Sequence, residues 1–195
     1  EQAHLILGVR GYAIGPPDRY ALQLLSVVLG GGLSARLFTE VREARGLAYY
    51  VHAAGSSYTD VGTVYSGAGV DVSRIDEAIT TILGELRKIA AEPVPADELE
   101  KARGYAKGRF VRRLEGPQGT TQYGLRRELL EGEIEEPEEL LRQLDAVTVE
   151  DVQRVARDLF DGTRLYLAVV GPYDDPERFE KLRHDIRRSV VHAEV

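Results

Sequence analysis

The grouping of strand and helix patterns is the feature of this sequence that most restricts its fold. Strand patterns occur at the start, in a pair between residues 47 and 70, and near residue 165, and helical patterns fill most of the interval between. Such blocks are typical of a sheet with helices segregated to one face. We therefore expect an α+β fold, with a largely antiparallel sheet and helices packed on one face. A length of 195 residues also predicts a single domain over residues 1–195.

The expected strands differ in how much of them is buried. Residues Ala3 to Tyr12 carry apolar side chains at both alternating sets of positions until Arg10, which predicts an interior strand covered on both sides. Residues 47–58 and 63–70 flank a Thr-Asp-Val-Gly turn and predict a hairpin. A final strand is expected over residues 165–170.

The expected helices are bounded by capping and stop signals. Apolar periodicity predicts helices over residues 18–29, 34–45, 75–89, 97–114, 120–130, 137–146 and from 148 onward, with Leu37, Val41 and Ala44 sharing one face of the second. Asp18 follows a Gly-Pro-Pro break and is a candidate N-cap, and capping-box spacings occur at Ser73 with Asp76 and at Thr148 with Asp151. Gly46 predicts a left-handed helix stop.

Composition and charge exclude several classes of protein. The chain is 43% hydrophobic and 29% charged, which suits a folded core. Its net charge of −7 argues against nucleic acids and anionic membrane surfaces as partners. No apolar run is long enough to span a membrane, and with no cysteine there are no disulfides or thiolate metal sites. The sequence starts without Met, so we expect a piece of a longer protein.

The segment from Leu29 to Val51, LGGGLSARLFTEVREARGLAYYV, carries the candidate chemistry. Arg42 falls in the last turn of an expected helix, and Tyr49 lies seven residues later, just inside the expected strand. The break at Gly46 folds the strand back from the helix, so the guanidinium and the phenol could converge. A guanidinium holds a carbonyl or carboxylate with a fixed fork of donors, and a tyrosine hydroxyl can donate to a developing oxyanion. Such a pair suits gripping a peptide near its scissile bond.

Simpler roles are open for both residues. Arg42 could complement the helix dipole or pair with Glu40 or Glu43 in solvent. Tyr49 could be a strand aromatic that packs in the core. In a regular strand, Tyr50 points to the opposite face, so only one of the two tyrosines can serve a cleft. The seven-residue spacing favours Tyr49.

The glycine run Gly30-Gly31-Gly32 has two interpretations. The lysine of a phosphate-binding loop is absent, so a nucleotide site is not indicated. Either the bare backbone of a flexible turn approaches substrate, or the run simply ends the preceding helix.

The histidines do not form a zinc motif. None of His4, His52, His184 and His192 belongs to HxxEH or HExxH, or to any pair with a helical ligand spacing of three or four. We therefore expect no metal site and no cofactor in this chain. His4 and His52 are interpreted as structural.

Two charged runs are interpreted as solvated faces. The first is acidic and runs from Glu131 to Glu139, and the second is the basic side of the helix over residues 97–114. In the alternative interpretation, both patches dock onto a partner.

The block GGGLSARLFTEVREARGLAY resembles the signature of the non-catalytic half of pitrilysin-type zinc peptidases, especially the processing peptidases. The likeness extends along the whole chain and implies an α/β roll like theirs. In that family two related halves face each other around a cleft. One half carries HxxEH and zinc, and the other lends an Arg and a Tyr seven residues apart. The resemblance implies that Arg42 and Tyr49 are this pair.

The resemblance leaves two functions open. The first is a non-catalytic half that helps to bind peptide substrate, is inactive alone, and acts with an HxxEH-bearing partner half that holds the zinc, on the same polypeptide or as a separate subunit. The second is a catalytically silent structural or assembly subunit, similar to respiratory-complex core proteins. Self-association as a homodimer is also expected. For location we expect a soluble protein of a bacterial cytoplasm or periplasm, and the sequence does not decide between them.

Overall fold

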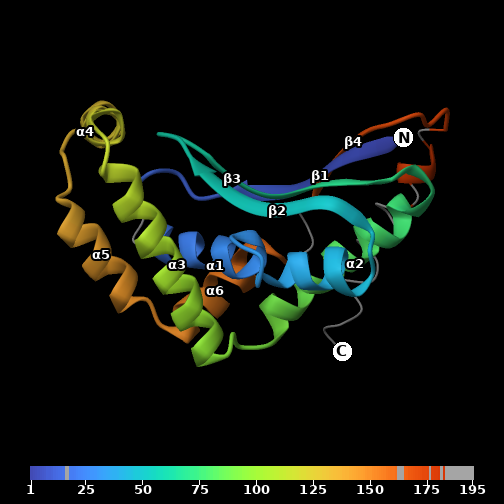
Figure 1. The fold of residues 1–195 in the computed structure, drawn as a ribbon, viewed down its shortest axis with the longest axis horizontal. Helices are drawn as coiled ribbons and strands as arrows, with labels where there is room; N and C mark the ends of the chain where they lie inside the picture. Colours follow the sequence, from blue (N-terminus) through green and yellow to red (C-terminus); the bar gives the residue numbers. More distant parts are fainter. Residues whose placement is uncertain (16–17, 162–164, 176, 181, 183–195) are drawn as a thin grey trace.

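The fold is a curved antiparallel sheet with helices on one face. The computed structural model describes residues 1–15, 18–161, 165–175, 177–180 and 182. Its described strands are β1 (Gln2–Gly11), β2 (Ala48–Ser57), β3 (Gly62–Asp71) and β4 (Tyr166–Val170). They lie in the order β2-β3-β1-β4, and every neighbouring pair is antiparallel. This confirms the expected α+β class. Figure 1 shows the helices below the sheet, while its concave side carries none of them.

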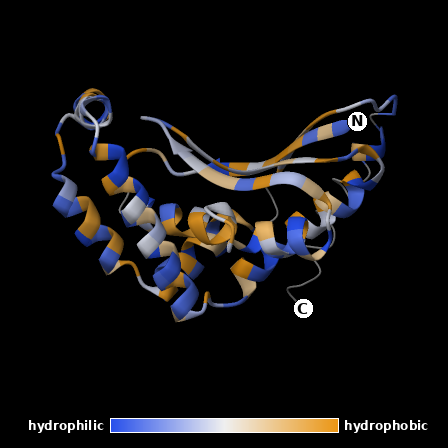
Figure 2. Ribbon diagram, viewed as in Figure 1, coloured by the Kyte–Doolittle hydropathy of each residue, from blue (hydrophilic) through white to orange (hydrophobic). Residues whose placement is uncertain are grey.

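The helix layer contains both α-helices and two short helical segments of other types. The α-helices are α1 (Arg19–Gly30), α2 (Ile75–Ala91), α3 (Ala96–Leu114), α4 (Pro117–Glu131), α5 (Pro137–Ala146) and α6 (Val149–Leu159). The π-helical segment η1 (Phe38–Ala44) precedes β2, and the 3-10 segment η2 (Val72–Arg74) precedes α2. Helix α1 packs beneath β2 and contacts α3 and α6, so it forms the centre of the layer. Figure 2 shows how strongly apolar this central helix is.

Strand β1 shows why one face of the sheet is buried. Ala3, Leu5, Leu7 and Val9 are almost fully buried against the helices, and the alternate positions point to the concave side. The expectation of an interior strand is confirmed, but the expectation of cover on both sides is wrong within the described residues. Ile6 is 50% exposed because no described element packs on its face of the sheet.

Only one of the expected helix caps has the predicted chemistry. The Thr148 hydroxyl accepts from the Asp151 amide, and the Asp151 carboxylate accepts from the Thr148 amide, a complete capping box. Asp18 precedes α1 but makes no cap, because its carboxylate is bound by the Arg154 guanidinium at 2.8 Å. Caps are therefore lost where a tertiary partner competes for the side chain.

The capping box expected at the start of α2 is also wrong. Ser73 does not cap the helix; its amide and hydroxyl both donate to the carboxylate of Asp71, two residues earlier. The Asp76 carboxylate pairs with the Arg178 guanidinium at 2.7 Å and does not reach back to Ser73. The local serine and aspartate are thus used by a preceding turn and by a distant arginine.

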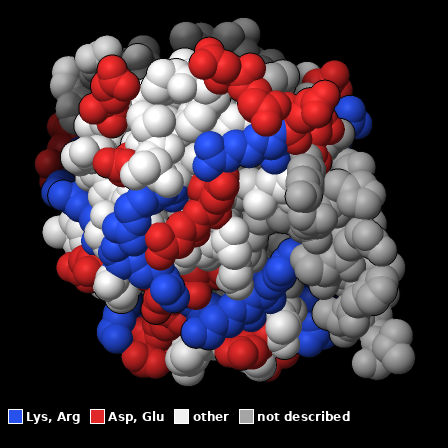
Figure 3. All heavy atoms as spheres, turned by 90° about the vertical axis from the view of Figure 1, so that its right-hand side faces the viewer, with Lys and Arg blue, Asp and Glu red and all other residues white. Residues whose placement is uncertain are grey.

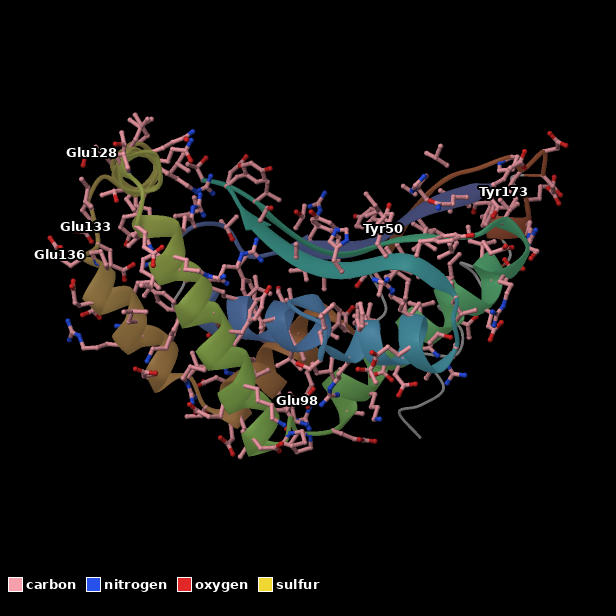
Figure 4. All side chains as sticks on the ribbon, viewed as in Figure 1. Tyr50, Glu98, Glu128, Glu133, Glu136 and Tyr173 are labelled. Atoms are coloured by element: carbon pink, nitrogen blue, oxygen red, sulfur yellow. The ribbon has the colours of Figure 1, made fainter. Side chains whose placement is uncertain are left out.

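The two charged runs are not simply solvated faces, and this is a correction. Arg127 is only 9% exposed, and it binds Glu131 at 2.5 Å and Glu135 at 2.6 Å. Arg19 reaches the same two carboxylates, so α1 anchors the end of α4. On the basic side of α3, Arg103 donates to the carbonyls of residues 144 and 147 at the end of α5. Charges interpreted as surface features thus join helices, while Glu128, Glu133 and Glu136 lie at the outer edge (Figure 4).

Candidate functional site

The turn between η1 and β2 has the form that the sequence predicts. Gly46 has a φ of 58°, a left-handed conformation that favours glycine. Backbone hydrogen bonds run from the Gly46 amide to the Arg42 carbonyl and from the Leu47 amide to the Val41 carbonyl. Val41 and Leu47 are buried and fix the two sides of the turn. The chain therefore reverses between the helical segment that carries Arg42 and the strand that carries Tyr49.

A distant arginine braces this turn from outside. The Arg74 guanidinium, at the end of η2, donates to the Arg45 carbonyl at 3.2 Å and to the Gly46 carbonyl at 3.5 Å. The same guanidinium is held by Glu77 at 3.0 Å. The start of α2 thus helps to fix the geometry of the turn.

Arg42 is exposed and has no carboxylate partner among the described residues. Its guanidinium carbon lies 5.0 Å from the centre of the Phe38 ring, which orients the side chain by a cation–π contact. Glu40, a partner that the sequence offers, pairs with Arg45 at 3.7 Å instead. The predicted helix face is only partly correct, because Ala44 is exposed while Leu37 and Val41 are buried. The wider winding of a π-helix moves Ala44 out of that face.

Tyr49 is the extra residue of a β-bulge. Ala48 lies opposite Val70 and Tyr50 lies opposite Gly69, so Tyr49 has no direct partner on β3. The side chains of Tyr49 and Tyr50 are both exposed, at 55% and 42%. The expected strict alternation between these tyrosines is therefore interrupted at this point of the strand. Bulges re-aim side chains and are frequent next to functional sites. A shared substrate contact for Arg42 and Tyr49 stays a prediction.

The glycine run is closely packed. Gly30 ends α1, and a Cβ built on it would lie 2.1 Å from the Ala53 amide nitrogen of β2. A Cβ on Gly31 would lie 2.7 Å from the Val27 Cα, and one on Gly32 would lie 3.3 Å from the Tyr105 ring. Gly30 and Gly31 thus have a packing reason to lack a side chain. Contact of the run with substrate stays a prediction.

A row of rings that was not predicted from the sequence lies on the concave face of the sheet beside this turn. His4 and Tyr50 stack with ring centres 6.0 Å apart, as do Tyr50 and His52, and His52 meets the edge of Tyr65 at 5.9 Å. His4 Nδ1 and the Tyr50 hydroxyl lie 2.9 Å apart, within hydrogen-bonding distance. Figure 4 shows Tyr50 on the side of the sheet away from the helices. The signal available in the sequence was the alternation of residues 50 and 52 along one strand.

The described residues offer no metal site. No group of three or more histidine or acidic side chains within them is placed to hold an ion. His184 and His192 lie outside the described residues. Within the same part of the chain, no helix is long and apolar enough to cross a membrane. Acidic and basic side chains intermingle over the α2 end of the molecule (Figure 3).

Comparison with known proteins identifies the family. The sequence profile described as the peptidase M16 inactive domain matches residues 1–104. The chain belongs to the peptidase M16 inactive-domain family. A relative from Streptomyces coelicolor, described as an uncharacterized zinc protease, is 38% identical over 91% of this chain and 38% of its own length. A Bacillus subtilis relative with the same description is 38% identical over 88% of this chain and 42% of its own length. The chain thus spans about two fifths of these relatives.

Solved structures share the fold of this M16 inactive domain. A peptidase M16 inactive domain from Pseudomonas fluorescens superposes with a TM-score of 0.77 at 22% identity, over 88% of this chain and 41% of that one. An inactive peptidase domain from Bordetella parapertussis gives 0.78 at 19% identity, over 90% of this chain and 96% of that one. A chain of complex III2 from Candida albicans gives 0.83 at 17% identity, over 95% of this chain and 46% of that one.

Proposed function

We propose that this M16 inactive domain is the non-catalytic half of a zinc metalloendopeptidase, and that residues 1–195 act as one domain. It helps to bind and orient peptide substrate, and it works only with an HxxEH-bearing half on the same polypeptide or on another subunit. Family membership and the absence of a zinc-ligand set among the described residues support this division of labour. The observation that carries the proposal is the exposed Arg42 and Tyr49 on either side of the turn at Gly46.

The two side chains have complementary tasks in this proposal. The catalytic half, with its zinc, supplies activated water for attack on the peptide carbonyl. The Tyr49 hydroxyl donates a hydrogen bond to the carbonyl oxygen as it becomes negative. The Arg42 guanidinium, which no described carboxylate neutralises, holds the substrate backbone through its fork of donors. Both groups serve orientation and charge stabilisation.

A single hydroxyl tests the role of Tyr49. In the assembled enzyme, Tyr49→Phe should lower kcat by about ten- to a thousandfold, the effect of losing one oxyanion donor. The zinc content of the catalytic half should stay the same. Tyr58→Phe is the matched control, because Tyr58 is 54% exposed at the hairpin end and has no proposed role. Turnover by Tyr49→Phe equal to that of the control would refute the proposed contact.

The second candidate is a structural or assembly subunit without a protease role. The fold shared with a chain of complex III2 is the observation that favours it. A chain with this role should assemble normally and tolerate Tyr49→Phe without any change in a peptidase assay. Homodimer formation, proposed for either role, is measured by analytical ultracentrifugation of the chain alone.

A further inference from the structure

The concave face of the sheet is apolar and open within the described structure. Ile6 on β1 is 50% exposed, and on β4 Tyr166 and Val170 are 57% and 72% exposed. The apolar residues of β1 on both faces led us to expect cover on both sides, but described helices cover only one (Figure 1). Large exposed apolar patches on soluble proteins mark binding surfaces. Some other body therefore fits this face.

Glycines give the face a floor on which rings lie flat. A Cβ on Gly69 would lie 2.4 Å from Cε1 of the Tyr50 ring, and one on Gly67 would lie 2.6 Å from Cε1 of the His52 ring. The two rings thus cover the backbone of β3. Gly67 and Gly69 are consequently buried although they belong to the open face. Each ring keeps its other side for contact with a ligand.

The face also lacks carboxylates, although the chain has 32 acidic residues. Residues that lie directly opposite one another in an antiparallel sheet share a face, so the register defines its members. From His4 to Arg10 they are His4, Ile6, Gly8 and Arg10 of β1, Thr63, Tyr65, Gly67 and Gly69 of β3, Tyr50, His52, Ala54 and Ser56 of β2, and Tyr166, Ala168 and Val170 of β4. An apolar occupant suits this surface better than a basic one.

We propose that this face binds an extended peptide segment with aromatic or large aliphatic side chains at alternate positions. Neighbouring rings are 5.9–6.0 Å apart. Alternate side chains of an extended peptide are about 6.6 Å apart, close to the same spacing. Tyr50 directly follows Tyr49, so a segment on the face runs on from the proposed cleavage-assisting site. The inference rests on the proposed function and assigns to it a class of substrate.

A stabilising role alone is the simplest competing explanation. Aromatic side chains that cover strand glycines strengthen a sheet without binding anything. This explanation covers Tyr50 and His52, but it does not account for Ile6, which lies opposite Gly67 and is half exposed. The other competing occupants are a second copy of this chain and the catalytic half.

Direct binding to the chain tests the proposal without catalysis. The probes are three fluorescein-labelled nine-residue peptides of Ser and Gln with blocked ends. The first has Phe at three alternate positions, the second has three contiguous Phe residues, and the third has none. Anisotropy titration should give the tightest binding for the first peptide. Equal affinity for the alternate and contiguous peptides would overturn the spacing argument, and no binding of either would overturn the proposal.

Two variants then locate the peptide. Tyr50→Ser and Ile6→Ser should each weaken binding of the alternate peptide by about three- to tenfold, the value of one aromatic contact. Val111→Ala removes an exposed apolar group from α3 in the helix layer, and it should bind like the wild type. Thermal unfolding checks that each variant is folded, and Ile6→Ser decides the question if Tyr50→Ser unfolds.

The competing occupants give different outcomes. A dimer that Ile6→Ser converts to monomer, without peptide binding by either form, would replace the proposal by self-association. Peptide binding that disappears when the catalytic half is added would mean that this half covers the face, and would also overturn it. Because no turnover is measured on the chain alone, a negative result leaves the roles of Arg42 and Tyr49 untouched. An unaffected kcat in Tyr49→Phe likewise leaves this binding test valid.

Discussion

Gly30→Ala should destabilise the protein, although alanine is the better helix former. The new Cβ would lie 2.1 Å from the Ala53 amide nitrogen and 2.7 Å from the His52 carbonyl carbon, and both are backbone atoms. Restoring an ordinary contact of 3.4 Å requires the end of α1 to move away from β2 by about 1.3 Å, the difference between those two distances. That movement opens the contacts around Leu29, which is fully buried.

The size of the effect follows from two opposing contributions. Overpacking of this kind costs up to about 3 kcal/mol when the neighbours cannot adjust. Replacing a helical glycine by alanine recovers about 1 kcal/mol of helix propensity. The net loss in the free energy of unfolding is therefore about 2 kcal/mol. In a chain of this size it lowers Tm by roughly 4–8 °C.

Gly84→Ala is the matched control for this measurement. Gly84 lies within α2 and is exposed, and a Cβ added to it would meet no neighbouring segment within 4 Å. The same substitution there should raise stability by about 0.5–1 kcal/mol. Both variants are compared by urea and thermal unfolding, followed by circular dichroism. A Gly30→Ala variant as stable as the wild type would refute the packing argument and favour a flexible turn at the glycine run.

Two further substitutions test local features of the fold. Burial raises the pKa of Glu85 above its ordinary value of 4.5, so ionisation opposes folding once the pH exceeds that value. Glu85→Gln should therefore raise Tm at pH 7 and lose this advantage as the pH falls below about 4.3, which melting curves across that range will measure, and a lower Tm at pH 7 would contradict the sign. Thr148→Ala removes the capping box of α6 and should cost about 1 kcal/mol in chemical unfolding. Thr80→Ala, at an exposed hydroxyl within α2, should cost much less, and equal losses would argue against a special capping effect.

The element order, the interior strand and the turn at Gly46 could be predicted because their signals are local. Left-handed backbone at Gly46 needs only a glycine, and the box between Thr148 and Asp151 needs only three-residue spacing. The cap expected at Asp18 was wrong because Arg154, 136 residues away, binds the same carboxylate. A tertiary competitor of this kind cannot be inferred from a local pattern.

The candidate site was predictable only in part. The positions of Arg42 and Tyr49 on either side of a turn followed from spacing, and both side chains are exposed. The bulge at Tyr49 had no signal in the sequence, because the extra residue is defined by its register with β3. The ring row was missed for a similar reason. It depends on which residues of three separate strands lie opposite one another, and only the sheet register sets that.

The brace from Arg74 to the carbonyls of Arg45 and Gly46 has a consequence for how such a site varies. The proposed catalytic geometry is tied to the beginning of a helix that no peptide in the cleft needs to touch. Substitutions at Arg74, or at Glu77 that holds it, would adjust the angle between helix and strand from a distance. Turnover could then be tuned during evolution or in the laboratory without altering any group that contacts substrate.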